Sequence, residues 1–268
     1  MQTIRTLGLL IVVSTFLNIS TISAQVIEGD VNLTTQAEVN LFSGSFITGN
    51  LTIPGSDVFD LSPISSLDSV AGSLWIFGNT ALTSLAGLET IASVGGGLSI
   101  EMNNALTNVD GLRNHSSVEE YVTIQFNPLL THLNLGSLSS AGGLLEVTYN
   151  TSLMNLDSLS NLSVLGGHLK LEENPALMDL DGLISLSSVG GDLEIYSNNA
   201  LANLDGLASR SSVGGRLYIT GNTELANLDG LANLTSIGGE LIVGSNALLL
   251  NLAGLSNLSS LTDRQYTP

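Results

Sequence analysis

The chain has 268 residues, of which 24 are acidic and six are Lys or Arg, for a formal charge of −18, and it has no cysteine. This balance disfavours nucleic acid and anionic membranes as partners, and the lack of cysteine excludes disulfides, thiol chemistry and Cys-ligated metals. With 43 % hydrophobic and only 11 % charged residues, the chain can bury a core without disulfides and is no disordered acidic tail.

Residues 1–24 have the order of parts of a secretory signal peptide. Arg5 precedes an apolar run over residues 7–17, and Ile22-Ser23-Ala24 precedes the expected mature start at Gln25. The run is far shorter than the roughly 20 residues that a membrane-spanning helix needs, so a retained anchor is the weaker interpretation. We therefore predict a secreted protein, extracellular or at the cell surface, without a transmembrane segment. Cleavage would remove Arg5 and no acid, lowering the formal charge from −18 to −19.

A repeat of 23 or 24 residues follows a lead-in segment over residues 25–47. A Gly-Gly pair, or its equivalent, recurs at this period, and each pair precedes an apolar-x-apolar triplet. Alternation with period two predicts a short strand at each triplet, and one strand per repeat predicts parallel stacking. Nine rungs at about 4.8 Å each give a sheet roughly 40 Å long. The triplets are Leu51-Ile53, Leu74-Ile76, Leu98-Ile100, Val122-Ile124, Leu145-Val147, Leu169-Leu171, Leu193-Ile195, Leu217-Ile219 and Leu241-Val243.

One asparagine stands at the same phase after each strand from the second onwards. Stacked rungs would turn this column into a ladder, in which each buried side-chain amide satisfies backbone groups of the neighbouring turns. A ligand-binding column is the alternative, but an inward position favours the structural role. The ladder comprises Asn79, Asn103, Asn127, Asn150, Asn174, Asn198, Asn222 and Asn246.

Five repeats carry an aspartate before the next Gly or Ser, mostly within Leu-Asp-Gly-Leu. A carboxylate at this position typically closes a turn by accepting N–H groups two residues further on. Calcium is the alternative, because stacked like charges repel, but no second acid recurs to complete six or more oxygen ligands. The sequence thus predicts no metal and no cofactor. The residues concerned are Asp110, Asp157, Asp181, Asp205 and Asp229.

The repeat wording, Gly-Gly-x-Leu-x-Ile-x-x-Asn-x-x-Leu-x-x-Leu-x-Gly-Leu-x-x-Leu-x-Ser-Val, resembles the receptor L-domain-like leucine-rich repeats of secreted proteins from Bacteroidetes-type bacteria. It is more distantly similar to fungal cell-wall proteins and to the L domains of insulin-receptor-like ectodomains. The resemblance covers about residues 28–262 and includes the lead-in over residues 29–39. It implies a β-rich, right-handed parallel solenoid over residues 48–262, outside the cell, with a role in adhesion or recognition.

The last repeat departs from this wording. Residues 259–263 read Ser-Ser-Leu-Thr-Asp where Ser-Val-Gly-Gly is expected, and the sequence stops at Pro268, before the position of a tenth strand. Because solenoids need a capped end, we expect residues 263–268 to be a truncated end.

No catalytic motif stands out. His115, His132 and His168 fall at different phases of the repeat, so we expect surface or loop residues and not metal ligands. The Gly-Gly corners recur in every rung, which marks them as structural and not as phosphate loops. A secreted polysaccharide-acting enzyme, or an accessory domain of one, is the alternative function, but it would need basic residues beside the acids, and few are available.

The alternation also identifies the outward face of the sheet. If Leu74 and Ile76 point inwards, Trp75 and Phe77 point outwards. We predict that Trp75, Phe77, Glu172, Glu194, Tyr196 and Tyr218 contribute to binding, with Ser99, Thr123 and Thr148 also on this face. Trp75 and Tyr218 are six rungs apart, roughly 29 Å, so an extended partner, a polysaccharide or a protein, is expected. The alternative for Trp75 is that the lead-in segment simply covers it.

Overall fold

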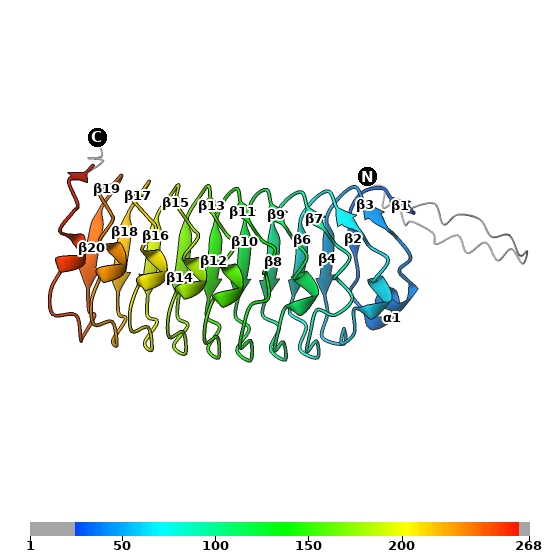
Figure 1. Ribbon diagram of the computed structural model, residues 1–268. Coiled ribbons are helices and arrows are strands. Elements are labelled where there is room, and N and C mark those ends of the chain that lie inside the picture. The colour runs from blue at the N-terminus through cyan, green and yellow to red at the C-terminus, as the bar shows by residue number, and fades with distance from the viewer. Residues whose placement is uncertain (1–24, 263–268) are drawn as a thin grey trace, which may run out of the picture.

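The computed structural model describes residues 25–262, and these form an elongated stack of rungs between two parallel sheets (Figure 1). The ten-stranded sheet begins with β2 (Val31–Asn32), and all its further strands have four residues. They are β4 (Leu51–Pro54), β6 (Leu74–Phe77), β8 (Leu98–Glu101), β10 (Val122–Gln125), β12 (Leu145–Thr148), β14 (Leu169–Glu172), β16 (Leu193–Tyr196), β18 (Leu217–Thr220) and β20 (Leu241–Gly244).

All nine predicted strands are present, each beginning at the first apolar residue of its triplet. Neighbouring strands pair in parallel and in register, so that Leu74 of β6 lies beside Leu98 of β8, and Leu98 beside Val122 of β10. The prediction of a parallel β-solenoid with a repeat of 23 or 24 residues is therefore confirmed.

A second, eleven-stranded sheet of two-residue strands was not predicted. Eight of its strands begin with serine, five of them as a Ser-Val pair, and most stand just before a Gly-Gly corner or its equivalent. In most of the strands the second, apolar residue is buried in the core. They are β1 (Val26–Ile27), β3 (Phe46–Ile47), β5 (Ser69–Val70), β7 (Ser93–Val94), β9 (Ser117–Val118), β11 (Ser140–Ala141), β13 (Val164–Leu165), β15 (Ser188–Val189), β17 (Ser212–Val213), β19 (Ser236–Ile237) and β21 (Ser260–Leu261).

Short 3-10 helices connect the two sheets in seven rungs, and the five from η3 to η7 stack on one another without interruption along one side (Figure 1). They are η1 (Ser62–Ile64), η2 (Asp110–Leu112), η3 (Asp157–Leu159), η4 (Asp181–Leu183), η5 (Asp205–Leu207), η6 (Asp229–Leu231) and η7 (Ala253–Leu255). Each puts one leucine or isoleucine into the core, so the interior is a continuous column of packed aliphatic side chains.

The asparagine column forms the expected ladder. Asn198 donates from Nδ2 to the carbonyl of Leu171 in the preceding rung, at 2.9 Å, and its Oδ1 accepts from the backbone N–H of Asn174, at 3.1 Å. Seven of the eight asparagines are completely buried, and Asn246 is 8 % exposed. Each amide thus satisfies backbone groups that a non-helical turn would leave bare.

The aspartates of Leu-Asp-Gly-Leu do not close turns in the predicted way. Each stands first in its 3-10 helix, and its backbone N–H donates to the side chain two residues earlier: Asp205 donates to Asn203 at 3.0 Å and Asp229 to Asn227 at 2.9 Å. The Asx turn is therefore made by the residue two positions before the aspartate, whose side-chain oxygen accepts from the first N–H of the helix. Burial, followed by the neighbouring carboxylates, raises the pKa of Asp181.

The lead-in segment adds strands β1 to β3 and the helix α1 (Gln36–Leu41) at the first end of the stack. The Thr35 side chain caps this helix by accepting from the backbone N–H of Glu38, and the Glu38 carboxylate accepts from the backbone N–H of Thr35, which forms a capping box. The predicted signal peptide and the predicted truncated end lie outside the described residues. Among residues 25–262, no helix is long and apolar enough to span a bilayer.

Two core positions depart from the repeat, and one contradicts the sequence prediction. His115 and Arg210 occupy the column that holds Leu162, Leu186 and Leu234 in other rungs, and they are 0 % and 1 % exposed. His115 is thus a core residue and not a surface one. Burial lowers its pKa to about 4, and burial likewise lowers the pKa of Arg210 to about 10. Within the described residues, neither side chain has a hydrogen-bond partner.

Candidate binding face

The outward face of the ten-stranded sheet carries two columns of side chains, because the second and fourth residues of each strand point away from the core. Strand register keeps each column in line. The first column is Thr52, Trp75, Ser99, Thr123, Glu146, Lys170, Glu194, Tyr218 and Ile242, and the second is Pro54, Phe77, Glu101, Gln125, Thr148, Glu172, Tyr196, Thr220 and Gly244.

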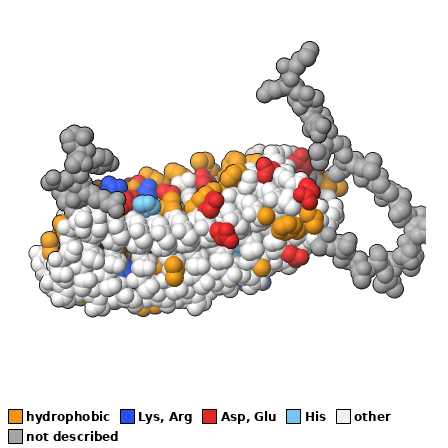
Figure 2. Space-filling view, turned by 90° about the horizontal axis from the view of Figure 1, so that it is seen from above, with side chains coloured by type: hydrophobic (Ala, Val, Ile, Leu, Met, Phe, Trp, Pro, Cys, Tyr) orange, Lys and Arg blue, Asp and Glu red, His pale blue; other side chains and the backbone are white. Residues whose placement is uncertain are grey.

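This face differs sharply from the outer side of the eleven-stranded sheet, where serine recurs in eight of the eleven strands. Seen from above, hydrophobic and charged side chains gather along one long edge of the molecule, and most of the remaining visible surface is uncharged and polar (Figure 2). The serines are Ser69, Ser93, Ser117, Ser140, Ser188, Ser212, Ser236 and Ser260. The chemically distinctive surface is therefore that of the ten-stranded sheet.

Trp75 is partly buried, but its hydrogen-bond partner lies further along the stack and not in the lead-in segment. Its indole N–H donates to the hydroxyl of Tyr121 at 2.8 Å, across the intervening strand β8. Together with Phe77, Ser99 and Glu101, these two rings line a hollow of about 300 Å³, which we call the aromatic hollow. The hollow brings together two predicted residues, Trp75 and Phe77.

Lys170 lies at the centre of the face and is held by two carboxylates. Its Nζ is 2.8 Å from Glu172 and 3.2 Å from Glu146. Partial burial opposes the charge, yet the hydrogen bonds to these carboxylates raise the pKa of Lys170 above its ordinary value. The hydroxyl of Tyr149 also donates to Glu172, at 3.0 Å. Both carboxylates of this central group therefore share one basic partner, which leaves the group with one net negative charge.

The tyrosines of β16 and β18 form the third part of the face. The rings of Tyr196 and Tyr218 meet edge to face, with centroids 5.6 Å apart, and Lys170 lies 5.8 Å from the centroid of Tyr196. Burial and then the Glu172 carboxylate raise the pKa of Tyr196 to about 12, so its hydroxyl stays protonated. Glu194 lies 3.6 Å from Arg216. Four of the predicted binding residues therefore lie in or beside this group: Glu172, Glu194, Tyr196 and Tyr218. Tyr218 on β18 is six strands away from Trp75 on β6.

Three outward positions are less accessible than the alternation suggests. Ser99, Thr123 and Thr148 are only 6 %, 7 % and 1 % exposed. Trp75 and Tyr121 meet over the strand of Ser99, and the hydroxyl of Thr148 lies 3.5 Å from the Gln125 amide. Larger neighbours cover these small side chains, so the direction of a side chain does not establish its exposure.

The sequence analysis did not predict a column of apolar side chains directly after the C-terminal ends of strands β8, β10 and β12. Met102, Phe126 and Tyr149 stand directly before ladder asparagines and are 51 %, 40 % and 36 % exposed. Their φ angles are 54°, 55° and 57°, in the left-handed region, where two other rungs have glycine. The rings of Phe126 and Tyr149 stack at 4.5 Å. The available signal was a large residue at a phase that glycine also occupies.

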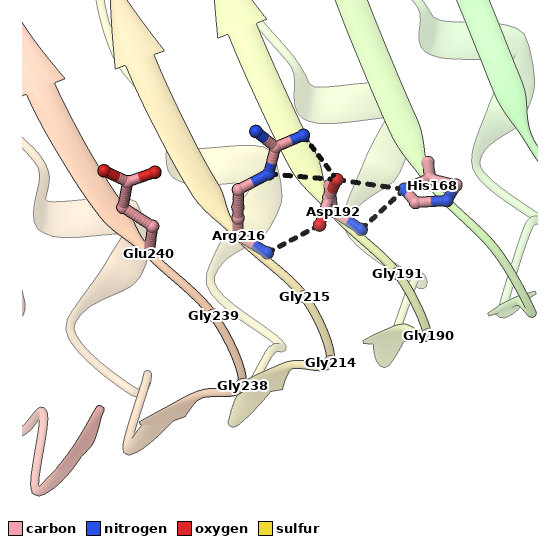
Figure 3. Close-up of a pocket in the computed structure, with 10 residues that line it drawn as sticks. All are labelled: His168, Gly190, Gly191, Asp192, Gly214, Gly215, Arg216, Gly238, Gly239 and Glu240. Atoms are coloured by element: carbon pink, nitrogen blue, oxygen red, sulfur yellow. Dashed lines mark hydrogen bonds and ion pairs between the residues drawn. The ribbon is translucent and has the colours of Figure 1, made fainter. Parts of the chain in front are cut away.

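A further hollow, of about 680 Å³, lies over the Gly-Gly corners (Figure 3). Asp192 accepts from the backbone N–H of Arg216 at 2.7 Å and pairs with its guanidinium at 3.2 Å, and the backbone N–H of Asp192 donates to His168. A Cβ on Gly214 would come within 2.1 Å of the carbonyl of Gly190. The glycines are therefore required for stacking, and the hollow is a consequence of the fold.

Within the described part of the chain, no three His, Asp or Glu side chains converge as metal ligands would. No protein-family model matches the chain, and no curated protein matches it significantly.

Proposed function

We propose that the protein is a non-catalytic binding module that acts at or outside the cell surface. Its outward face on the ten-stranded sheet would recognise an extended partner, a polysaccharide or a protein. One observation carries this proposal: two groups of aromatic side chains, Trp75 with Tyr121 and Tyr196 with Tyr218, are held in fixed geometry on one rigid face.

Pre-ordered rings favour binding because little conformational entropy remains to be lost on contact. The first ring pair spans β6 to β10 and the second spans β16 and β18, so the two are too far apart for one small ligand. A partner that contacts both must be long. Because Glu101, Glu146, Glu172 and Glu194 line the face, a neutral or cationic partner suits it better than an anionic one.

The proposed location rests on the sequence. The signal-peptide pattern over residues 1–24 supports export, and the resemblance to receptor L-domain-like repeats supports a role in recognition. Fold alone does not establish a ligand, so the proposal depends on the face.

Binding to a glycan array and capture of surface proteins would test this function. After a ligand is confirmed, Trp75→Ala and Tyr218→Ala should each weaken its binding, whereas Ile184→Ala should not. Ile184 is a matched control because it is 46 % exposed at the end of η4, away from the sheet face. Folded Trp75→Ala and Tyr218→Ala variants with undiminished binding would exclude this face.

A further inference from the structure

The aromatic hollow combines rings on its walls with a carboxylate. Its lining is Trp75, Phe77 and Tyr121 together with Ser99 and Glu101. The Trp75–Tyr121 hydrogen bond joins residues 46 positions apart in the chain and fixes two of the rings. Trp75 and Phe77 come from one strand, so their separation is fixed by the backbone. The hollow is therefore formed before any ligand arrives.

Glu101 is the only ionisable acid in this lining, and its charge is not neutralised locally. In the register of the sheet its neighbours are Phe77 and Gln125, neither of which is charged. The hydroxyl of Ser99 donates to its carboxylate. Among residues 25–262, no Lys, Arg or His lies within ion-pair distance of Glu101, whereas Glu146, Glu172 and Glu194 each have a basic partner.

Aromatic faces carry negative potential and attract ammonium groups, and a carboxylate adds a full charge to this attraction. We propose that the aromatic hollow binds an organic ammonium group, either a free quaternary amine or a lysine side chain of a partner. This deepens the proposed function, because it rests on the same face and names the chemistry that one end of it recognises. A neutral sugar could stack on the same rings but would leave the Glu101 charge without a counterpart.

Trp75 is the single tryptophan of the chain, so its fluorescence reports directly on the hollow. The full chain would be titrated at constant ionic strength with tetramethylammonium and with Nα-acetyl-lysine methylamide, the two sources of the cation. The uncharged isostere 3,3-dimethylbutanol and a neutral cello-oligosaccharide serve as comparison ligands. We expect saturable changes in Trp75 emission with one or both cations, and binding at least about tenfold weaker for the isostere.

Glu101→Gln keeps the shape of the hollow and removes its charge, and it should weaken cation binding about tenfold without changing the melting temperature. Glu224→Gln is the matched control, since it removes one equally negative charge from an exposed turn outside the sheet face. Tyr121→Phe removes the acceptor of the Trp75 hydrogen bond and should weaken binding less. Circular dichroism would establish that each variant is folded.

The proposal is overturned if Glu101→Gln binds the cations as tightly as the wild type, if the isostere binds equally well, or if only the oligosaccharide binds. These outcomes differ from failure of the proposed function. Partner binding that responds to Tyr218→Ala, together with absent cation binding, would refute the hollow alone. Partner binding insensitive to both Trp75→Ala and Tyr218→Ala would refute the extended face.

Discussion

Replacing Asn198 with alanine tests the asparagine ladder in the middle of the stack. The side chain satisfies two buried backbone groups, the carbonyl of Leu171 at 2.9 Å and the N–H of Asn174 at 3.1 Å. Alanine would leave both groups without partners in a space that is closed to solvent. Each unsatisfied buried group costs about 1–3 kcal/mol, so the free energy of unfolding should fall by about 2–6 kcal/mol.

Urea unfolding followed by circular dichroism would measure the change. Asn79→Ala is the internal comparison, because Asn79 opens the ladder: its Nδ2 donates to Ile53, but its Oδ1 has no hydrogen-bond partner in the described residues. Its loss should therefore be about half as large. An unchanged unfolding midpoint for Asn198→Ala would refute a structural ladder, and equal losses at both positions would refute the two-contact account of its energy.

Three other changes test the core and the acids. His115 has a folded pKa of about 4 against an ordinary 6.5, so the unfolded chain takes up the proton first as the pH falls, and stability should decline by about 3 kcal/mol between pH 6.5 and 4. In His115→Leu, pH-dependent melting should lose this part of the decline, and an unaltered profile would contradict burial of the ring. Arg210→Leu should raise the free energy of unfolding by about 3 kcal/mol, because it replaces an unpaired buried cation with the residue of its column; a lower midpoint in urea would refute this. A chelator should leave the melting temperature unchanged if the repeated aspartates, Asp181 and its equivalents in the other rungs, bind no calcium. A clear drop in the melting temperature would reverse that prediction.

The predictable part of this fold is the part that repeats. Nine triplets and eight asparagines recur at one period, so a single physical interpretation applied to all of them. The two-residue strands, such as Ser212–Val213, were not predicted, because an alternating pattern cannot be recognised in only two residues. The turn before each 3-10 helix was misassigned for a different reason. Asn203 and Asp205 are both good turn residues, and only the geometry of the rung shows which side chain reaches the N–H.

For the candidate site, the sequence predicted which way the side chains point but not which side chains contact one another. Alternation placed Trp75 and Phe77 on one face, and in the structure both line the aromatic hollow. Tyr121 was missed because it precedes its strand, at the phase of Gly97 in the rung before. A Cβ on Gly97 would collide with the Tyr121 ring at 2.2 Å, so the small residue in one rung makes room for the large one in the next. Such compensation between rungs has no signature within a single repeat.

The stacked pair of Phe126 and Tyr149 shows how the fold can accommodate an exposed apolar surface. Both residues have positive φ, at a column position where Gly78 and Gly221 avoid the cost of roughly 1 kcal/mol per residue that a side chain incurs. Ring stacking at 4.5 Å returns roughly 0.5–1.5 kcal/mol, which offsets only part of the combined strain. The fold therefore gains little from these rings, and glycine would serve it at least as well. Both rings remain more than a third exposed. Their apolar surface is therefore available to a partner that reaches the edge of the sheet where the strands end.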